Sequence, residues 1–492
     1  MLVQSAGLIL LPLYTTYLTR EDFGFLEILT RIGETVSTVL VIGGLRLATL
    51  SFYQQADSQE EKRQIVTGSL FSILFTCLFG GICTLLLIRS FPGLVPLPEK
   101  EGAQRLLQLA VLSIAIEPLL LIPQALMQAR TESIRYAAVN LVLFIARVSL
   151  SIFFVAWLRM DIMGVLLATI LSVGISGSLL TFREMSFGTV LPTRKQIVGL
   201  WSFALPFLPG GLCFFLLHHG DRFWLSSYWG MAEVGIYALG YKLALALNTF
   251  ALGPVLLVWS PQVYKLANNQ DAPRQFGLAF TRMLTLFIFW GMGLCLFRNE
   301  VVGILSRPEY AGAASVIIPI VIACLFQTAA TLMDSAFYIR RRTDLKLAVT
   351  LISTIVMVGL YMLLIPKGGA LGAALATLGG FLFLMVSTFF VSQRLFPVDY
   401  EYSRLGGILG LAICLFLGVE SLPHGIILFW TKWVVWGLFP VILWHAGLIS
   451  AVEKKYAADL VEKIRTGIRL GKNITKPLKA GDVLSRAWRS SG

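Results

Sequence analysis

The chain has 492 residues, of which 57% are hydrophobic and only 14% are charged, and its formal net charge is +13. A soluble globular protein of this length needs far more polar surface, so the composition excludes that class. The long uncharged runs also exceed the short alternating strands of an outer-membrane barrel. The sequence therefore predicts an all-α polytopic membrane protein.

Fourteen apolar runs are long enough to cross a bilayer as helices of about 20 residues. In chain order they cover residues 1–18, 24–50, 65–88, 105–127, 136–158, 162–182, 197–219, 231–258, 276–297, 312–337, 345–365, 369–391, 405–421 and 425–449. Lysine and arginine are more frequent in every second connection. By the positive-inside rule, this predicts an inner-membrane type protein with both termini in the cytoplasm.

The excess positive charge does not indicate a nucleic-acid partner. It lies largely in the connections and the C-terminal tail, where topology and anionic lipid headgroups explain it. The six cysteines are scattered singly through apolar runs, so the sequence predicts neither a metal site nor a cofactor. After residue 453, apolar residues recur every four positions among basic ones, which predicts an amphipathic helix on the inner leaflet.

The chain repeats itself at an offset of about 210 residues. At offset 211, the matched positions are Gly24, Arg31, Thr38 and Tyr53 with Gly235, Lys242, Thr249 and Tyr264. Arg130 to Glu132 recur as Arg342 to Asp344 at offset 212, and Gly164 recurs as Gly372 at offset 208. Three matches in the same order at nearly constant spacing indicate an internal duplication.

Each repeat holds six spans, so both repeats insert with the same orientation around a pseudo-twofold axis along the membrane normal. The predicted domains are an N-terminal six-helix lobe at 1–185, a C-terminal six-helix lobe at 196–395, two additional transmembrane helices at 403–450 and a basic cytoplasmic tail at 453–492. This is the parallel-repeat plan of alternating-access carriers, which bind substrate between their halves.

Arg31, Arg147 and Lys242 lie inside predicted spans, where a cation is costly without a partner, a water-filled cavity or an anionic ligand. On one helix, Arg31, Glu34 and Arg46 share a face. The predicted substrate-binding residues of a cationic cavity are the four cations Arg31, Arg46, Arg147 and Lys242. Two alternatives remain: Arg31 and Glu34 neutralise each other, and Arg46 extends to the headgroups.

Three acids in or near the spans are candidates for ion coupling: Glu34, Glu117 and Asp334. The alternative is that each acid is a fixed counter-ion of a nearby cation. Asp221 and Arg222 are adjacent at the end of a span, which predicts an interfacial ion pair. Lys432 is near the outer end of its span and is predicted to extend to the headgroups.

Two segments resemble a known family. Asp221-Arg222-Phe223, Gly230 and the run from Glu233 to Lys242 resemble the second-half signature of bacterial polysaccharide-biosynthesis flippases. The stretch from Pro12 to Gly24 is similar to the opening segment of the same family. The resemblance covers roughly residues 1–395 and places the chain near the Wzx-type, or O-antigen, flippases of the multidrug, oligosaccharidyl-lipid and polysaccharide exporter superfamily.

The resemblance implies a non-enzymatic carrier that flips an undecaprenyl-pyrophosphate-linked oligosaccharide, a repeat unit of lipopolysaccharide or another polysaccharide, across the inner membrane. It implies a cationic central cavity and ion coupling, with membrane lipids and other polysaccharide assembly proteins as further partners. Arginine also suits this ligand physically, because its planar fork binds phosphate oxygens bidentately.

Two other functions remain as alternatives. A multidrug or cation antiporter of the same superfamily would share the architecture, but its substrate favours acids and aromatic rings, and the best-centred charges here are basic. A membrane-embedded polysaccharide polymerase or glycosyltransferase would be expected to carry a large extramembrane loop. The predicted connections are too short for one.

Overall fold

The computed structural model describes residues 7, 9–39, 42–90, 103–186, 190–267, 269–423 and 425–448. Throughout these ranges the regular structure is helical and contains no strand, which confirms the predicted all-α class. The predicted amphipathic helix after residue 453 lies outside the described residues.

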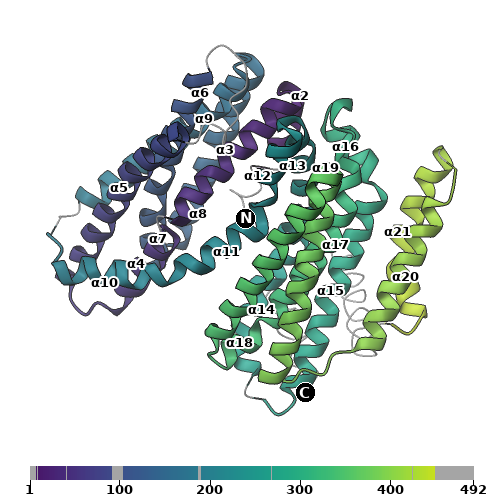
Figure 1. The fold of residues 1–492 in the computed structure, drawn as a ribbon. Helices are drawn as coiled ribbons and strands as arrows, with labels where there is room; N and C mark the ends of the chain where they lie inside the picture. The colour runs from purple at the N-terminus through teal and green to yellow at the C-terminus, as the bar shows by residue number, and fades with distance from the viewer. Residues whose placement is uncertain are drawn as a thin grey trace, which may run out of the picture. The chain divides into compact units, whose positions relative to one another are not determined.

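The helices follow one another closely (Figure 1). The first half of the chain forms α2 (Leu11–Tyr17), α3 (Arg20–Val39), α4 (Ile42–Gln55), α5 (Gln59–Ser90), α6 (Ala103–Ile116), α7 (Leu121–Ala129), α8 (Ser133–Ser151), α9 (Asp161–Ser186), α10 (Arg194–Ala204), α11 (Leu208–His219), α12 (Asp221–Trp229) and α13 (Met231–Leu247). The second half forms α14 (Gly253–Leu266), α15 (Ala272–Leu296), α16 (Arg298–Leu305), α17 (Ala313–Met333), α18 (Ser335–Ile339), α19 (Thr343–Leu395), α20 (Tyr402–Glu420) and α21 (Ile426–His445).

Short irregular turns join several of these helices into longer spans. One is the 3₁₀ turn Glu117–Leu120 between α6 and α7, which contains Pro118. A proline frees a backbone carbonyl from its helical hydrogen bond, and such a carbonyl needs another donor inside a membrane. Pro123 of α7, just after this turn, leaves the carbonyl of Leu119 without its helical donor, and the Thr181 hydroxyl of α9 donates to that carbonyl at 3.2 Å.

In the described part of the chain, eleven helices are long and apolar enough to cross a membrane, or up to twelve if α3 and α4 form one bent span. The predicted number of fourteen is not confirmed. The 53-residue α19 contains two predicted spans, 345–365 and 369–391, which join at Gly369 with a left-handed φ of 54°. The predicted span at 1–18 includes residues that the structure does not describe.

The chain forms two compact units. Unit 1 comprises Met1–Leu243, Val302–Ile320 and Leu347–Phe383, and unit 2 comprises Ala244–Val301, Val321–Lys346 and Leu384–Gly492. These ranges differ from the predicted lobes at 1–185 and 196–395, so the division into two six-helix lobes stays a prediction.

Within unit 1, α4 packs against α5, α7 and α10, and α9 packs against α6 and α8. The helix α3 packs along α11. Within unit 2, α15 packs against both C-terminal helices, α20 and α21, and these two also contact each other. Apolar side chains of all three helices form a common core in unit 2 that includes Leu296, Ile408 and Phe439.

The helices α3 and α13 of unit 1 cross with their backbones in direct contact. A Cβ added at Gly24 would lie 1.9 Å from the carbonyl oxygen of Met231. A Cβ added at Gly235 would lie 2.2 Å from the carbonyl oxygen of Arg20. Small residues allow such close approach between membrane helices. The two glycines are partners in the sequence repeat, so residues that a twofold axis would relate meet at this crossing.

Gly24→Ala is therefore expected to destabilise the protein. The added methyl group has no room and must separate α3 from α13, at a cost of about 1–3 kcal/mol or more. The measurement is the thermal unfolding midpoint of the purified protein. Gly43→Ala in α4 is the matched control, because a Cβ there meets no atom within 4 Å. Equal unfolding midpoints of the two variants would show that this close crossing is absent.

The repeat is also visible in the local backbone. Asp161, with φ 48°, and Gly369, with φ 54°, each lie three residues before the repeated glycine, Gly164 or Gly372. A second left-handed residue precedes α8 at Thr131, with φ 57°, and α19 at Arg341, with φ 54°.

The left-handed residues Thr131 and Arg341 correct the alignment of the repeat. The sequence pattern paired Arg130 with Arg342 at offset 212, but the turn geometry pairs Arg130 with Arg340 at offset 210. The amide of Arg130 donates to the carbonyl of Leu126, and the amide of Arg340 donates to that of Ala336. The repeated arginine in the sequence is therefore shifted by two positions from the structural equivalent.

Candidate functional site

Three cations in unit 1 converge on one buried carboxylate, Glu27 of α3. Its side chain is only 1% exposed. Glu27 Oε1 lies 3.0 Å from Arg31 Nε of the same helix and 3.3 Å from Arg222 Nε of α12. Glu27 Oε2 lies 2.7 Å from Lys242 Nζ of α13. Both repeat-related cations, Arg31 and Lys242, thus share one counter-ion.

The crossing of α3 and α13 explains this geometry. Arg31 and Lys242 each follow the crossing glycine of their helix by seven residues, which is two helical turns on the same face. Glu27 lies one turn before Arg31, so its carboxylate reaches both cations. The ammonium of Lys242 also lies 4.7 Å from the ring centre of Phe23.

Arg222 is the fully buried member of the group, with a side chain that is 1% exposed. It donates to Asp221 Oδ1 at 2.6 Å and to the carbonyl of His218 at 2.9 Å, and its guanidinium lies 4.1 Å from the ring centre of Tyr241. Tyr237 donates its hydroxyl proton to the other oxygen of Asp221. These contacts hold Arg222 in place, so we assign it a positioning role for Glu27.

Glu34 binds the opposite side of Arg31. Its Oε2 lies 2.5 Å from Arg31 Nη1 and 3.2 Å from His219 Nε2 of α11. The Glu34 side chain is 43% exposed, whereas that of Arg31 is 12% exposed and that of Lys242 is 31% exposed. The outer members of the group are therefore accessible, and the inner pair of Glu27 and Arg222 is not.

The formal charges of this group cancel when His219 is neutral. Its cations are Arg31, Arg222 and Lys242, and its carboxylates are Glu27, Glu34 and Asp221. We refer to these six residues as the Glu27 cluster. Because the charges balance, an anionic ligand that enters must compete with a carboxylate for Arg31 or Lys242.

The structure separates the predicted site residues. Arg31 and Lys242 join the cluster, but Arg46 does not, because the predicted helix breaks after Val39 and continues as α4 at a bend of 48°. Arg46 instead donates to the side chain of Gln128 in α7 at 2.8 Å. Arg31 and Arg46 therefore lie on two different helices instead of the one predicted helix, and a role of Arg46 in substrate binding stays a prediction.

Arg147 of α8 is half-buried, and no hydrogen bond or ion pair joins it to any residue that the structure describes. One turn further along α8, Ser151 forms a hydrogen bond with Tyr14 of α2 at 3.3 Å. Arg147 thus belongs to the same unit as the Glu27 cluster without a direct bond to it. An uncompensated cation within a membrane span is costly, which keeps Arg147 a candidate ligand-binding residue.

The predicted coupling acids also differ in their surroundings. Asp334 is nearly buried and lies 2.7 Å from Lys346 Nζ, the arrangement expected of a fixed counter-ion. Glu117 is exposed in the 3₁₀ turn between α6 and α7. Only Glu34 of the three contacts the cations of the Glu27 cluster in the described part of the chain.

The sequence interpretation missed Glu27, and it misplaced Asp221 and Arg222. The signal for Glu27 was its spacing, since it precedes Arg31 by one helical turn, the best distance for an ion pair on a helix. The pair of Asp221 and Arg222 is confirmed at 2.6 Å, but it is buried rather than interfacial. No local pattern shows that Arg222 reaches a residue 195 positions away.

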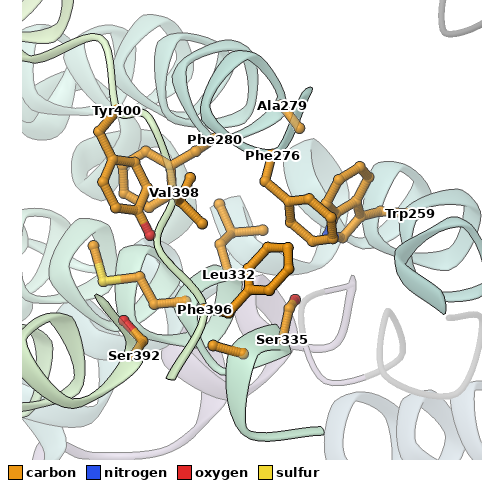
Figure 2. A pocket seen from close by; sticks show the side chains of 12 residues that line it. Trp259, Phe276, Ala279, Phe280, Leu332, Ser335, Ser392, Phe396, Val398 and Tyr400 are labelled. Carbon is orange, nitrogen blue, oxygen red and sulfur yellow. The ribbon is translucent and has the colours of Figure 1, made fainter. Parts of the chain in front are cut away.

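A separate pocket in unit 2 is unsuited to a charged ligand. Figure 2 shows the rings of Trp259, Phe276, Phe396 and Tyr400 around it, and none of its lining residues is charged. Its cavity volume is about 20 Å³, which is room for about one water molecule. The Glu27 cluster is accordingly the candidate site for an anion.

A comparison with known families shows to which family the chain belongs. The model of the family described as "Polysaccharide biosynthesis protein" matches residues 16–315, which is more than half of the chain. The chain belongs to this polysaccharide biosynthesis family. The matched range includes every residue of the Glu27 cluster.

One curated relative and two solved structures are similar to this chain. An uncharacterized membrane protein of Methanocaldococcus jannaschii, MJ1068, is 21% identical over 295 residues, which are 58% of this chain and 57% of the relative. The chain thus matches little more than half the length of that relative.

The solved structures share the fold. The lipid II flippase MurJ in an inward closed conformation is similar with a TM-score of 0.72 and 15% identity, over 91% of this chain and 98% of MurJ. An inward-facing multidrug resistance MATE family transporter of the MOP superfamily has a TM-score of 0.67 and 15% identity, over 80% of this chain and 94% of the transporter. The chain is thus a multi-pass membrane protein with the fold of these transporters.

Proposed function

We propose that this protein is a Wzx-type flippase that moves an undecaprenyl-pyrophosphate-linked oligosaccharide across the bacterial inner membrane by alternating access. The observation that carries the proposal is the convergence of Arg31 and Lys242 on Glu27. The family match supports a role in polysaccharide biosynthesis, and the MurJ-like fold supports a lipid-linked cargo.

In this proposal the pyrophosphate displaces Glu27 and Glu34 from the two accessible cations. A pyrophosphate offers several oxygens, and charge-assisted hydrogen bonds to arginine are short and strong. Glu27 keeps Arg222 as its partner when the ligand arrives, so the carboxylate is not left uncompensated. Arg147, which has no ion pair among the described residues, is proposed as a further cation for the same headgroup.

We further propose that Glu34 couples transport to protons. With Glu34 ionised, the formal charge of the Glu27 cluster is zero; with Glu34 protonated, it is +1. Protonation also frees Arg31 from one of its two carboxylates. A bound proton would therefore favour the anionic cargo, and loss of the proton would favour its release.

A multidrug or cation antiporter remains the second candidate. The observation that favours it is the exposed carboxylate of Glu34, which could bind a cationic substrate as well as a proton. The fold does not discriminate between a flippase and an antiporter, because the MATE transporter shares it.

Transport by the purified protein in proteoliposomes distinguishes the two functions. We expect a pyrophosphate-linked oligosaccharide to change leaflets only in vesicles that contain the protein, and a lipophilic drug cation to be unaffected. Uptake or release of the drug cation without movement of the lipid-linked glycan would replace the flippase by the antiporter.

A further inference from the structure

Unit 2 contains a polar pocket where the ends of α16, α20 and α21 meet. Its cavity volume is about 250 Å³. That is slightly below the range of about 300–1,000 Å³ typical of sites for drug-sized ligands. Two ion pairs, an amide and an aromatic ring line it: Arg298, Asn299, Glu300, Glu420, Phe429 and Lys432. A ligand of one ring matches this size.

The charges of the pocket are already paired. Arg298 donates to both oxygens of Glu420 at 2.8 Å, and this bidentate pair fixes both groups. The hydrogen bond to Glu420 raises the pKa of the Arg298 guanidinium, so this side chain stays a cation. Lys432 Nζ lies 2.6 Å from Glu300 Oε1. No cation is therefore free for a phosphate.

Lys432 corrects the sequence prediction. Its side chain was expected to extend to the lipid headgroups, but it is buried within the protein and paired with Glu300. A buried ion pair has a high desolvation cost and is weak evidence for stability. Stability alone therefore gives little reason for this buried pair.

One acceptor in the pocket remains open. Glu300 Oε2 is buried and accepts no hydrogen bond from the described residues. A buried acceptor without a partner costs about 1–3 kcal/mol, so a ligand that donates a hydrogen bond there is favoured. A metal cation or an amine is disfavoured by the ammonium of Lys432 on the other oxygen of the same carboxylate.

The remaining wall is apolar. Phe429 lines the pocket with a side chain that is 37% exposed, and Leu428 lies beside it. A ligand with hydroxyl donors on its edge and an apolar face matches a carboxylate acceptor and an aromatic ring. Neutral sugars have this combination, whereas phosphate-bearing headgroups do not.

We propose that this pocket binds one neutral sugar ring, with a hydroxyl on Glu300 Oε2 and the apolar face on Phe429. The binding goes beyond the proposed function and does not depend on it. In the predicted orientation the pocket lies at the helix ends that face away from the cytoplasm, and its use to receive the transported glycan rests on the proposed function.

Titration of the full-length protein with neutral methyl glycosides tests the proposal. The protein is held in nanodiscs free of glycolipid and of sugar-based detergent, and saturation-transfer NMR reports binding. We expect saturable millimolar binding of at least one glycoside. Asn299→Trp, which fills the pocket from an exposed position, and Phe429→Leu should each weaken it by about tenfold. Asn299→Ala is the matched control and should bind within about threefold of the wild type.

Two results would overturn the proposal. One is the absence of saturable binding by any neutral glycoside to the folded wild-type protein. The other is equal binding by the wild type and by Asn299→Trp, with the unfolding midpoint of the variant unchanged. Displacement of the sugar by glycerophosphoethanolamine would also contradict it, because it would identify a lipid-headgroup site. The flipping assay is separate, so failure of the proposed function leaves this test intact.

Discussion

Replacement of both Arg31 and Lys242 by alanine is expected to abolish glycan export. Each side chain supplies a charge-assisted hydrogen bond to the headgroup, worth about 1.5–3 kcal/mol. Since about 1.4 kcal/mol corresponds to a tenfold change in affinity, the double variant should bind the lipid-linked oligosaccharide at least about 100-fold more weakly. The measurements are complementation of a strain that lacks the exporter and equilibrium binding in nanodiscs.

Matched variants separate this effect from misfolding. Glu27 keeps Arg222 as a partner in the double variant, so the protein should remain in the membrane at a normal level. Lys367→Ala removes an exposed cation outside the Glu27 cluster and should leave export unchanged. Lys242→Arg keeps the charge and should keep most of the binding. Normal export by the double variant would exclude both residues from the binding site.

Replacement of Glu34 by glutamine is expected to separate binding from proton coupling. The amide imitates the protonated acid, so the Glu27 cluster is fixed at a formal charge of +1. A half-exposed like charge near the site costs roughly 1 kcal/mol, so cargo binding at neutral pH should tighten by roughly fivefold. Transport driven by a proton gradient should be lost.

The measurement is cargo affinity as a function of pH, together with gradient-driven transport in proteoliposomes. In the wild type, cargo affinity should rise as the pH falls, because protonation of Glu34 adds positive charge to the cluster. In Glu34→Gln this dependence should disappear. Asp334→Asn is the control, because Asp334 is paired with Lys346 elsewhere in the chain. An unchanged pH dependence in Glu34→Gln would remove Glu34 from coupling.

The fold class was accessible from the sequence because a membrane imposes one strong rule. Backbone groups within lipid must be satisfied by helices, so long apolar runs predict helices directly. The break after Val39 was not accessible, because the predicted span at 24–50 is one apolar run that divides into α3 and α4. Apolar residues continue on both sides of this break, so the length of the apolar run does not reveal it.

Only part of the candidate site could be predicted from the sequence. A cation deep in a span is unusual, so Arg31 and Lys242 stood out, and the structure brings them to one carboxylate. The partner itself was missed because Glu27 belongs to the polar start of its helix, where acids are common. Arg222 was assigned to the interface because its neighbours in sequence are polar, whereas its burial depends on α3, far away in the chain.

The predicted internal repeat matches the structure in one part and was misaligned in another. It related Arg31 to Lys242, and the close crossing of α3 and α13 at Gly24 and Gly235 explains why the two cations approach each other. It was shifted by two residues at Arg130, since Arg130 to Glu132 match Arg342 to Asp344 in sequence, whereas only the arginine matches when the alignment starts at Arg340. Turn geometry resolves this shift because the left-handed residue marks the register.

The most direct test of the account compares two cargo lipids that differ only in charge. One carries the oligosaccharide on a polyprenyl pyrophosphate, and the other carries the same oligosaccharide on the neutral polyprenol. Binding to the wild-type protein in nanodiscs is measured for both. If Arg31 and Lys242 hold the headgroup, the pyrophosphate form binds at least about 100-fold more tightly. Equal affinities for the charged and the neutral lipid would contradict the account.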